Sequence, residues 1–443
     1  MARLIYSTLL RLALPLWLAR LWWRGRREPG YRQHLGERLG WGVHQPAGAL
    51  WVHAVSLGET LAAAPLIAAL RERLPGVPLL LTHGTATGRD AGRALLQPGD
   101  RQAWLPIDTP GAVRRFLARQ RPALGVLMET EVWPELQAQA ARAGVPMVLA
   151  NARLSERSWA KGRRLQRLMR PALATMHCVL AQTQADAQRL RALGAGDVRV
   201  MGNLKFDLVL REDLLSLGRR WRQSLGRPVV LAAVTREAEE QALLSAWCVR
   251  PWASGRPLLL IVPRHPQRFD EVARLVTAAG LRLWRRSALA ATSRGQDPGA
   301  WGPPSADAGA ADAGAADVWL GDSLGEMALY YGLADAALLG GSFAPLGGQN
   351  LIESLACGCP MVVGPHTFNF ADATEGAISA GAARRVASMA EAVDLLQQWL
   401  APEEAQARAV RAASGVSFAA AHRGAAQRMA QALAALWPGA GRG

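Results

Sequence analysis

Two acidic motifs follow apolar runs and carry the carboxylates best placed for acid–base chemistry. SLGET puts Glu59 at a glycine turn where a helix is expected to begin, directly after LWVHAV. A carboxylate there can accept a proton from a substrate hydroxyl, or it can simply complement the helix dipole. METEVWPEL puts Glu129 and Glu131 at the end of another apolar run. Alternate residues of an extended segment share a side, so one of these acids is expected to orient a partner of Glu59, unless both are exposed loop acids.

The segment 338–370, LLGGSFAPLGGQNLIESLACGCPMVVGPHTFNF, has the features of a nucleotide site. An apolar run enters two glycine turns, and a helix is expected to open at Asn350. Glycine turns expose backbone amides to a bound phosphate or sugar, and a helix N-terminus favours an anion. Glu353 stands one turn beyond Asn350 on the same face, where a carboxylate suits ribose hydroxyls. The alternative is an ordinary strand, turn and helix.

Three further motifs place polar side chains after apolar runs. GNLKFD carries Lys205, which can balance a phosphate or carboxylate charge unless it is simply solvated. PRHP carries Arg264 and His265 after the run PLLLIVP, and arginine suits bidentate contact with phosphate. GDSLGEM carries Gly325 and Glu326 in another turn, whose amides and carboxylate can hold a base or ribose.

The histidines and cysteines do not predict a metal site. His53, His83 and His366 lie far apart without a spacing such as HExxH, so each is expected to be a hydrogen-bonding residue. We therefore expect no metal and no cofactor. The cysteines show no zinc or redox spacing and are expected to be reduced, small buried sulfurs; they are Cys178, Cys248, Cys357 and Cys359.

The elements that must position these residues form two domains. From residue 49 onward, apolar runs alternate with helical patterns, which is typical of a parallel sheet covered on both faces. The alternation pauses near 207–227 and restarts at 228, and 443 residues exceed what one core usually supports. The sequence thus predicts an α/β protein with two facing doubly wound domains, whose ligands bind beyond the carboxyl ends of the strands.

The expected boundaries follow from the same alternation. They give an N-terminal segment at 1–30, a first α/β domain at 31–207, a linker at 208–227, a second α/β domain at 228–424, and a C-terminal helix and tail at 425–443. The second domain is expected to carry a flexible insertion at 291–317 that is rich in Gly, Ala, Pro and Asp. The last helix is expected to cross back to the first domain.

The N-terminus and the charge point to an anionic surface or ligand. Residues 4–23 are apolar apart from Arg11 and Arg20 and are followed by the basic run RGRRE. This pattern fits a helix lying in the membrane interface, a spanning helix, or a core helix. The formal net charge of +16 implies an anionic partner such as nucleic acid, phospholipid head groups or a phosphorylated substrate.

Seven motifs in order resemble one known enzyme family over nearly the whole chain outside 291–317. They are SLGET, METEVWP, GNLKFD, PRHPQRF, GDSLGEM, GGQNLIE and GPHTFNF, and they resemble the 3-deoxy-D-manno-octulosonic acid (Kdo) transferases of Gram-negative bacteria. The resemblance implies the two-domain GT-B glycosyltransferase fold with an N-terminal membrane-binding helix. It also implies metal-independent transfer of Kdo from CMP-Kdo to the tetraacyl disaccharide 1,4'-bisphosphate precursor of lipid A, with inversion at the anomeric carbon.

The resemblance further implies the cellular setting and the partners. The enzyme would act in lipopolysaccharide inner-core biosynthesis at the cytoplasmic face of the cell inner membrane. Its partners would be the CMP-Kdo donor, the lipid A precursor and inner-membrane phospholipids, with no nucleic acid. The first domain would bind the acceptor and the second would bind CMP.

The resemblance assigns roles by position. Glu59 matches the general base, and Glu131 and Lys205 match positions assigned to transition-state stabilisation. The CMP-binding segments match Pro263, Arg264, Leu324, Gly325, Glu326, Asn350, Leu351, Ile352 and Glu353. The chain departs from the family pattern at Gln349, where histidine is common, and at Ser354, where proline is common. Gln349 can form hydrogen bonds but cannot titrate.

Two other classes of protein compete with this interpretation. A GT-B transferase or epimerase that uses a UDP-sugar would need the same glycine turn and the same Asn350 and Glu353 pair. A basic membrane-surface or RNA-binding protein without catalysis would explain the charge, but it predicts aromatic residues interleaved with basic ones on exposed strands. Most aromatic residues here are instead tryptophans near the N-terminus or inside predicted helices.

Overall fold

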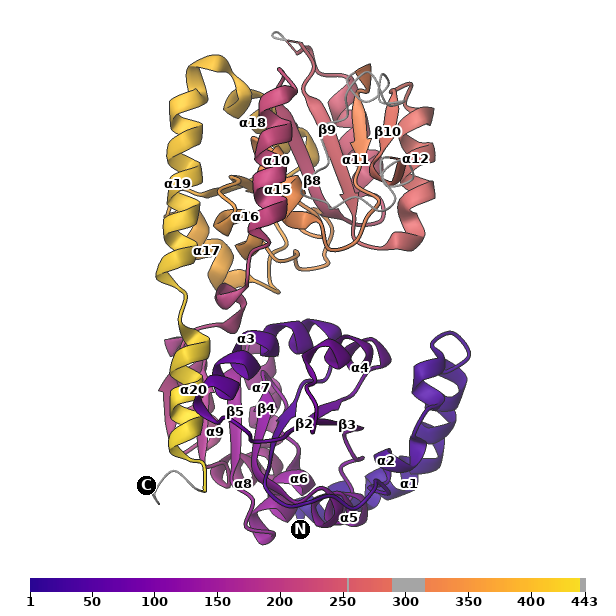
Figure 1. Ribbon diagram of the computed structural model, residues 1–443, viewed down its shortest axis with the longest axis vertical. Helices are drawn as coiled ribbons and strands as arrows, with labels where there is room; N and C mark the ends of the chain where they lie inside the picture. The colour runs from indigo at the N-terminus through magenta and orange to yellow at the C-terminus, as the bar shows by residue number, and fades with distance from the viewer. Residues whose placement is uncertain (253–254, 289–314, 439–443) are drawn as a thin grey trace. The chain divides into compact units, whose positions relative to one another are not determined.

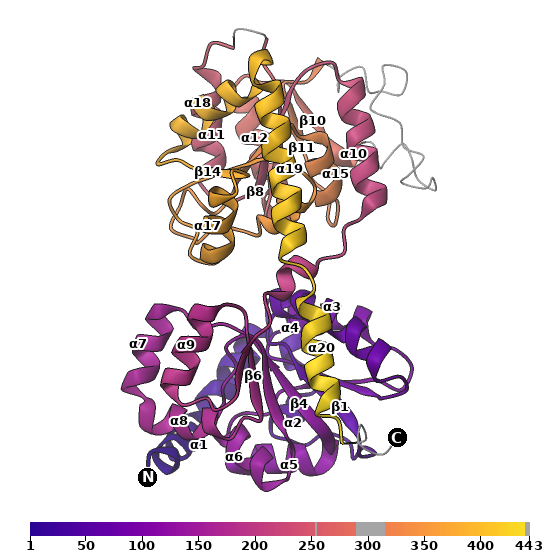
Figure 2. The same ribbon diagram turned by 90° about the vertical axis from the view of Figure 1, so that its left-hand side faces the viewer.

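The computed structural model describes residues 1–252, 255–288 and 315–438 and divides the chain into two compact units. The first unit comprises Met1–Leu208 and the C-terminal segment that begins at His422, and the second comprises Val209–Ala421. In each unit, helices cover both faces of a sheet of seven parallel strands (Figure 1, Figure 2). This is the doubly wound α/β architecture that the alternating pattern predicted.

The first sheet has the strand order β3-β2-β1-β4-β5-β6-β7. The chain moves outward from β1 to β3 and then returns to β4 on the other side of β1, so the switch point of this sheet lies between β1 and β4. The strands are β1 (Ala49–His53), β2 (Leu79–His83), β3 (Arg101–Trp104), β4 (Pro122–Met128), β5 (Met147–Ala152), β6 (Cys178–Ala181) and β7 (Val198–Val200).

The helices of the first unit flank this sheet and include the last helix of the chain. They are α1 (Ala2–Arg24), α2 (Leu35–Arg38), α3 (Leu57–Arg73), α4 (Ala86–Gly92), α5 (Pro110–Gln120), α6 (Pro134–Arg142), α7 (Glu156–Arg164), α8 (Gln166–Ala174), α9 (Gln184–Leu193) and α20 (Ala425–Ala435), with the short 3-10 helices η1 (Pro29–Arg32), η2 (Arg93–Leu95) and η3 (Leu204–Asp207).

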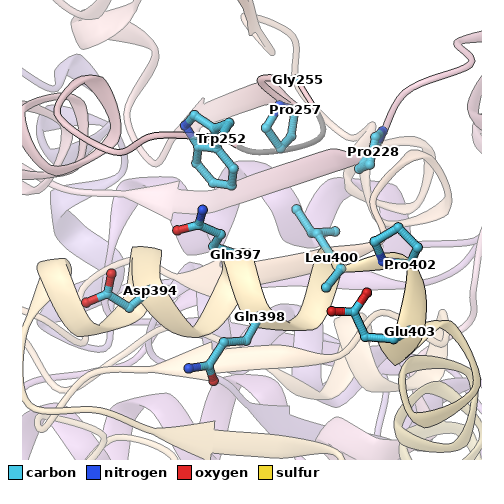
Figure 3. A pocket seen from close by; sticks show the side chains of 11 residues that line it. Pro228, Trp252, Gly255, Pro257, Asp394, Gln397, Gln398, Leu400, Pro402 and Glu403 are labelled. Atoms are coloured by element: carbon cyan, nitrogen blue, oxygen red, sulfur yellow. The ribbon is translucent and has the colours of Figure 1, made fainter.

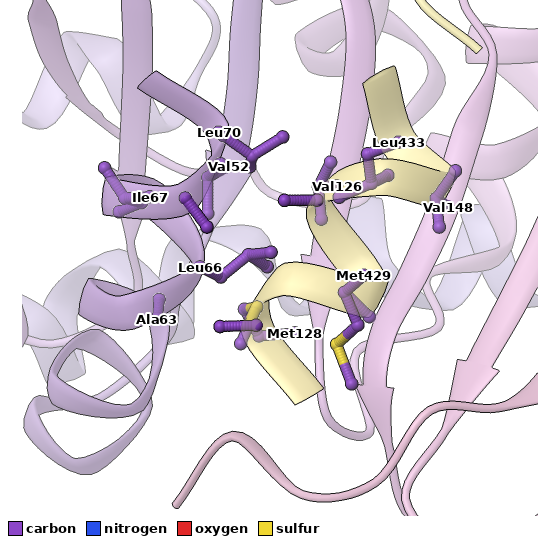
Figure 4. Packing of buried hydrophobic residues seen from close by; sticks show 14 of the residues in the cluster. Val52, Ala63, Leu66, Ile67, Leu70, Val126, Met128, Val148, Met429 and Leu433 are labelled. Atoms are coloured by element: carbon purple, nitrogen blue, oxygen red, sulfur yellow. The ribbon is translucent and has the colours of Figure 1, made fainter. Parts of the chain in front are cut away.

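Apolar layers on both faces hold the first sheet. On one face, α3 and α20 pack over the central strands, where Leu66, Val126 and Met429 lie together (Figure 4). On the other face, Phe116 of α5 packs against Trp51 of β1, with ring centroids 5.0 Å apart. Every residue of β1 is buried, and its sequence is accordingly apolar except for His53 at its end. Burial of one leucine such as Leu66 stabilises the fold by roughly 2 kcal/mol.

Helix α1 is docked on the first unit by polar side chains as well as apolar ones. The Tyr6 hydroxyl donates a hydrogen bond to Asp108 at 2.8 Å, and the Ser7 hydroxyl donates to Glu135 at 2.5 Å. Arg3 pairs with the same Glu135 at 3.4 Å. Ser7 is only 3% exposed, so the contact with Glu135 is a buried one. These bonds hold the N-terminal half of α1 against the loop that follows β3 and against the first turn of α6.

Helix α20 brings the end of the chain back to the first unit. Asp207, at the end of η3, accepts hydrogen bonds from the backbone N–H groups of Gly424 and Ala426 and so caps the N-terminus of α20. The segment 425–443 therefore contributes a helix to the core of the first sheet, as far as its described residues reach.

The second sheet has the strand order β10-β11-β9-β8-β12-β13-β14, with its switch point between β8 and β12. Its strands are β8 (Val229–Thr235), β9 (Leu258–Pro263), β10 (Leu283–Arg285), β11 (Val318–Leu320), β12 (Ala336–Leu339), β13 (Met361–Val363) and β14 (Ala383–Arg385). Its helices are α10 (Glu212–Ser224), α11 (Glu239–Cys248), α12 (Phe269–Ala278), α15 (Met327–Leu333), α16 (Ile352–Ala356), α17 (Ala371–Ser379), α18 (Met389–Leu400) and α19 (Ala405–Ala421), with the 3-10 helices η4 (Pro266–Arg268) and η7 (Pro402–Glu404).

The segment 208–227, expected to be a linker, instead contains α10, which belongs to the second unit. Gly218 of α10 packs so closely on α15 that an added Cβ would lie 2.1 Å from the carbonyl oxygen of Leu329. Trp221 is buried against Trp319, with ring centroids 6.3 Å apart. The expected domains were bounded by their strands. Because 208–227 forms a helix and no strand, the sequence pattern assigned it to neither domain.

The expected insertion at 291–317 lies outside the described residues except for its last three. Of these, Asp317 pairs with Arg282 at 3.1 Å and leads directly into β11. The four cysteines are free thiols; Cys178, Cys357 and Cys359 are buried, as predicted, whereas Cys248 is only half-buried.

Candidate active site

Glu59 lies at the switch point of the first sheet, in the first turn of α3. Its Oε2 accepts a hydrogen bond from the backbone N–H of Val55 at 2.8 Å, and the Ser56 hydroxyl lies 3.5 Å from Oε1. The carboxylate is therefore folded back toward the end of β1, where ligands of doubly wound sheets bind. Its role as a base stays a prediction.

The electrostatics of Glu59 fit proton transfer near neutral pH. Burial is the main reason that the pKa of Glu59 is raised to about 7, and nearby Glu129 and Glu131 act in the same direction. The hydrogen bond from Val55 opposes this rise in pKa because it stabilises the ionised carboxylate. An acid that only complements a helix dipole would be exposed and fully ionised, so the geometry favours a chemical role.

Glu129 and Glu131 do not follow the strand alternation that the sequence suggested. Strand β4 ends at Met128, and Glu129 has a φ of 55°, which lies in the left-handed region. The chain turns there, and the N–H of Glu131 donates to the carbonyl oxygen of Met128 at 3.3 Å. The alternation rule holds only inside a strand, so the prediction that both acids share a side for this reason was wrong. The two carboxylates have different partners.

Glu129 pairs with Lys205 at 3.6 Å. Two asparagines position this lysine: the N–H of Leu204 donates to Oδ1 of Asn151 at 3.1 Å, and the N–H of Lys205 donates to Oδ1 of Asn203 at 3.0 Å. Helix η3 thereby carries Lys205 to the carboxyl edge of the first sheet. The predicted Glu59, Glu131 and Lys205 thus all lie at one edge of this sheet.

Glu131 lies beside a buried histidine and a tryptophan. Its Oε2 accepts a hydrogen bond from Trp133 Nε1 at 2.7 Å and lies 3.9 Å from Nε2 of His53. Burial, and secondarily the charge of Glu129, raise the pKa of Glu131. His53 Nδ1 lies 3.1 Å from the carbonyl oxygen of Thr82, which can only accept, so Nδ1 carries the proton and Nε2 presents a lone pair. Burial lowers the pKa of His53 to about 3, and its ring is therefore neutral.

In the second unit, cations gather where β8 and β9 end. Arg264 follows β9 and is exposed, and its N–H donates to the carbonyl oxygen of Thr235 at 2.9 Å. Arg236 directly follows β8, is half-buried and pairs with Glu237 at 3.4 Å. Burial and then the charges of Arg236 and Arg264 lower the pKa of His265. This cluster is suited to a phosphate.

The sequence interpretation named Arg264 but missed Arg236. The signal was present, because Arg236 comes one residue after the apolar run PVVLAAV and Arg264 comes directly after PLLLIVP. Both runs become adjacent strands of one sheet, so both arginines reach the same edge. The prediction of phosphate contacts at this edge therefore extends to a second residue.

The first glycine turn does not offer all of its amides to a ligand. The N–H groups of Gly341 and Phe343 donate to the buried carboxylate of Glu239 at 2.8 and 3.1 Å. The expectation of bare amides there was wrong, because an acid some 100 residues earlier in the chain already accepts from them. Gln349 packs over this turn, since an added Cβ on Gly341 would lie 3.2 Å from its Nε2.

The helix after the second glycine turn begins at Ile352, two residues later than predicted. Asn350 lies before it and accepts a hydrogen bond from the N–H of Ile352 through Oδ1 at 3.0 Å. Leu351 and Ile352 are buried. Burial raises the pKa of Glu353, and in the described part of the chain this carboxylate has neither a hydrogen bond nor an ion pair. It is free to accept from the hydroxyls of a bound ribose.

The loop before α15 is held by Glu326. This carboxylate pairs with Arg286 at 2.8 Å and accepts a hydrogen bond from the Ser323 hydroxyl. Leu324 is 75% exposed and Gly325 has a φ of +77°, a conformation that favours glycine. Glu326 is thus occupied with shaping the loop, while the backbone of Leu324 and Gly325 faces solvent.

A large cavity in the second unit is remote from these groups. Its volume is about 540 Å³, and it lies at the amino ends of β8 and β9, beside Pro228, Pro257 and Gln397 (Figure 3). Arg236 and Arg264 follow the opposite, carboxyl ends of the same strands. Among the described residues, no three His, Cys, Asp or Glu side chains form a group suited to a metal ion.

Comparisons with known proteins identify the family. Residues 33–208 match the family model described as 3-Deoxy-D-manno-octulosonic-acid transferase (kdotransferase). The chain is 47% identical over 446 residues to the 3-deoxy-D-manno-octulosonic acid transferase of Bordetella pertussis, covering 98% of this chain and 99% of that one. It is 32% identical to the enzyme of the same description from Haemophilus influenzae, covering 98% of both chains.

Solved structures support the fold. The crystal structure of UDP-GlcNAc 2-epimerase from Neisseria meningitidis, bound to UDP-GlcNAc, matches with a TM-score of 0.56 at 13% identity, covering 87% of this chain and 99% of that one. At this identity the match shows the fold alone, which is the two-domain GT-B type. The full-length similarity to the Bordetella and Haemophilus enzymes shows that the chain belongs to the 3-deoxy-D-manno-octulosonic acid transferases, a family of glycosyltransferases.

Proposed function

We propose that this enzyme transfers Kdo from CMP-Kdo to the tetraacyl disaccharide 1,4'-bisphosphate precursor of lipid A, in the assembly of the lipopolysaccharide inner core. The observation that carries the proposal is Glu59, a shielded carboxylate at a sheet switch point whose pKa is raised to about 7. Such a group is about half ionised near neutral pH, so it can accept a proton from a substrate hydroxyl while its conjugate acid is still formed readily.

The reaction is proposed to be one displacement with inversion at the anomeric carbon. The acceptor hydroxyl oxygen forms a bond to that carbon while its proton passes to Glu59. The bond from the anomeric carbon to the CMP phosphate oxygen breaks, and its electron pair leaves with CMP. Positive charge develops on the sugar, and the carboxylate of Glu131 is suited to stabilise it. Lys205, paired with Glu129 at 3.6 Å, supplies the compensating cation in this acidic cluster.

The CMP moiety is proposed to bind the second unit through the segments that the family resemblance indicates. Arg264, joined by Arg236, is suited to the single phosphate, which cations and amides can hold without a metal. Glu353 is suited to accept from the ribose hydroxyls. The full set of proposed contacts is Pro263, Arg264, Leu324, Gly325, Glu326, Asn350, Leu351, Ile352 and Glu353.

The enzyme is proposed to work at the cytoplasmic face of the inner membrane, with α1 lying in the phospholipid interface. Helix α1 is long and apolar enough to cross a bilayer by length and composition. Crossing would strip Tyr6 and Ser7 from Asp108 and Glu135 and leave buried polar groups unsatisfied. One outward face of α1 instead carries a stripe of exposed apolar residues suited to lipid contact: Ile5, Leu9, Leu12, Leu16 and Trp23.

The experiment that tests the proposal is transfer from freshly generated CMP-Kdo to a radiolabelled tetraacyl bisphosphate acceptor, with products separated by thin-layer chromatography. Wild type is expected to transfer Kdo, E59Q to lose the activity, and E72Q to keep it. Glu72 is a matched control because it is an exposed acid on the same helix. The number of product bands gives the number of sugars added. Transfer from a UDP-sugar but not from CMP-Kdo would contradict the proposal.

A further inference from the structure

A cavity within the first unit lies directly beneath α1. Its volume is about 250 Å³, roughly that of eight water molecules at about 30 Å³ each, or of a similar number of methylene groups. Its wall is mainly apolar and comes from α1, the end of α2, the end of β1 and the loops after β1, β2, β3 and β4. The lining residues include Ala13, Leu14 and Trp17 of α1 with Arg38, His53 and Val55.

The cavity shares its wall with the candidate catalytic groups. Val55 lines it, and the N–H of Val55 holds the carboxylate of Glu59 at 2.8 Å. His53 and Trp133 also line it, and both face Oε2 of Glu131, at 3.9 and 2.7 Å. A molecule that fills this cavity is therefore fixed next to the residues proposed to perform the transfer.

The helix that covers the cavity has two apolar faces. Leu10, Leu14 and Trp17 recur at helical spacing, are partly buried and point inward, whereas the exposed stripe on the outward face is suited to lipid. Ala13 lines the cavity and is nevertheless exposed, so it lies at the opening. A chain leaving the bilayer beside α1 would meet this opening.

One wall of the cavity carries a buried cation without an acidic partner. Arg38 is 3% exposed, and no ion pair joins it to a carboxylate in the described part of the chain. Its guanidinium stacks on Trp104 at 3.9 Å and donates to the carbonyl oxygen of Gly84 at 3.3 Å, while its Nε lacks a partner. The adjacent Glu37 is bound to Arg89 at 2.7 Å. A buried charge of this kind is costly unless a ligand compensates it.

The acid that lines the same cavity does not compensate Arg38. The oxygens of Asp108 accept from the Tyr6 hydroxyl and from the N–H groups of Glu135 and Leu136. Three donors thus stabilise this carboxylate where it helps to dock α1. The ligand that matches this lining has an apolar chain for the apolar wall and a negatively charged group for Arg38.

We propose that this cavity is an acyl-chain subsite, which takes one fatty-acyl chain of the anionic lipid acceptor and presents Arg38 to its negatively charged head group. The inference rests on the proposed function for the identity of the acceptor. Such a subsite would let the first unit select an acylated substrate and set it beside Glu59.

The test compares A13F, which places a ring in the opening, with A19F, the same substitution at an exposed position of α1 that does not line the cavity. Both are assayed in detergent with the tetraacyl acceptor and with its deacylated disaccharide bisphosphate. For each variant, the KM for the tetraacyl acceptor is divided by the KM for the deacylated acceptor. A13F is expected to raise this ratio about tenfold relative to wild type, and A19F to leave it within twofold. An unchanged ratio in A13F overturns the subsite.

Direct binding gives a readout that does not depend on transfer. n-Decyl phosphate is expected to bind the wild-type protein in calorimetry at least tenfold more tightly than n-decanol or inorganic phosphate, and A13F is expected to lose this binding. R38M, checked for folding by circular dichroism, is expected to bind n-decyl phosphate and n-decanol equally. Equal affinity of wild type and A13F for n-decyl phosphate overturns the subsite.

The remaining outcomes separate this inference from the proposed function. If wild type binds n-decyl phosphate as expected but transfers Kdo to no acceptor, the proposed reaction fails and the anionic acyl site stands. If transfer proceeds and A13F weakens only cosedimentation with phospholipid vesicles, the cavity holds a bilayer lipid and its assignment to the acceptor is overturned.

Discussion

Nε2 of His53 and Oε2 of Glu131 lie 3.9 Å apart in buried surroundings, and no hydrogen bond joins them. Because Nδ1 of His53 donates to Thr82, its Nε2 presents a lone pair to the carboxylate. Two hydrogen-bond acceptors therefore face one another. A hydrogen bond at this place needs a donor, which is either a substrate hydroxyl or Glu131 in its protonated form.

Replacement of Glu131 by glutamine is expected to separate activity from stability. E131Q supplies an amide donor to His53 and removes a buried negative charge, so its free energy of unfolding should equal or exceed that of wild type. Loss of the charge that stabilises the transition state should lower kcat about 100-fold. Denaturant unfolding and steady-state kinetics measure the two effects. Wild-type kcat in a folded E131Q would refute the assigned role.

The rate of transfer is expected to depend on pH through Glu59. With the pKa of Glu59 raised to about 7, the ionised base is lost below neutrality. We expect kcat/KM to rise about tenfold per pH unit up to about pH 7 and to be level above it. The residual activity of E59Q should show no such step. A step near pH 4.5 in the wild type would mean that burial does not perturb this acid.

The same shift predicts that Glu59 costs stability when it is ionised. Its folded pKa lies above the unfolded value, so the folded state binds more protons between about pH 4.5 and 7, and stability falls as pH rises through this window. After allowance for its partial exposure, E59Q should raise the free energy of unfolding at pH 8 by about 1 kcal/mol and change little at pH 4. Urea unfolding at both pH values tests this, with E72Q as the control.

Arg236 and Arg264 are expected to contribute alike to donor binding. A charge-assisted contact with phosphate is worth about 1.5–3 kcal/mol, so R236M and R264M should each raise the KM for CMP-Kdo by at least tenfold. R274M is the control, because Arg274 is an exposed arginine of the neighbouring α12. If R264M raises the KM for CMP-Kdo and R236M does not, the phosphate contacts only the arginine that follows β9.

Arg268 is expected to stabilise the second unit. It is buried and pairs with the fully buried Glu240 at 2.7 Å, so R268M would leave that carboxylate without its cation. The expected loss of unfolding free energy is about 3–5 kcal/mol. E271Q removes only the exposed arm of the same cluster and should lower the unfolding free energy far less than R268M does. Chemical denaturation measures both, and equal effects of the two variants would contradict the account.

The sequence already determined the α/β class and most strands, because a strand buried on both faces must be a continuous apolar run. The runs around Trp51, Val126 and Leu260 are of this kind, and all became central strands. The short edge strand β14 was not anticipated. Its sequence, ARR, carries two exposed arginines, and pairing on one side only does not demand an apolar run.

The sequence also pointed to Glu59, Lys205 and Glu353, since charged side chains in the turns and first helical residues after apolar strands reach the carboxyl edge of a parallel sheet. Only the tertiary structure decided their partners. Lys205 meets Glu129, because η3 returns to that edge, and Glu239 takes the amides at Gly341 from more than 100 residues away. Contacts of this length depend on how the chain packs, and local spacing cannot determine them. The cavity beneath α1 likewise exists only once the helix has docked.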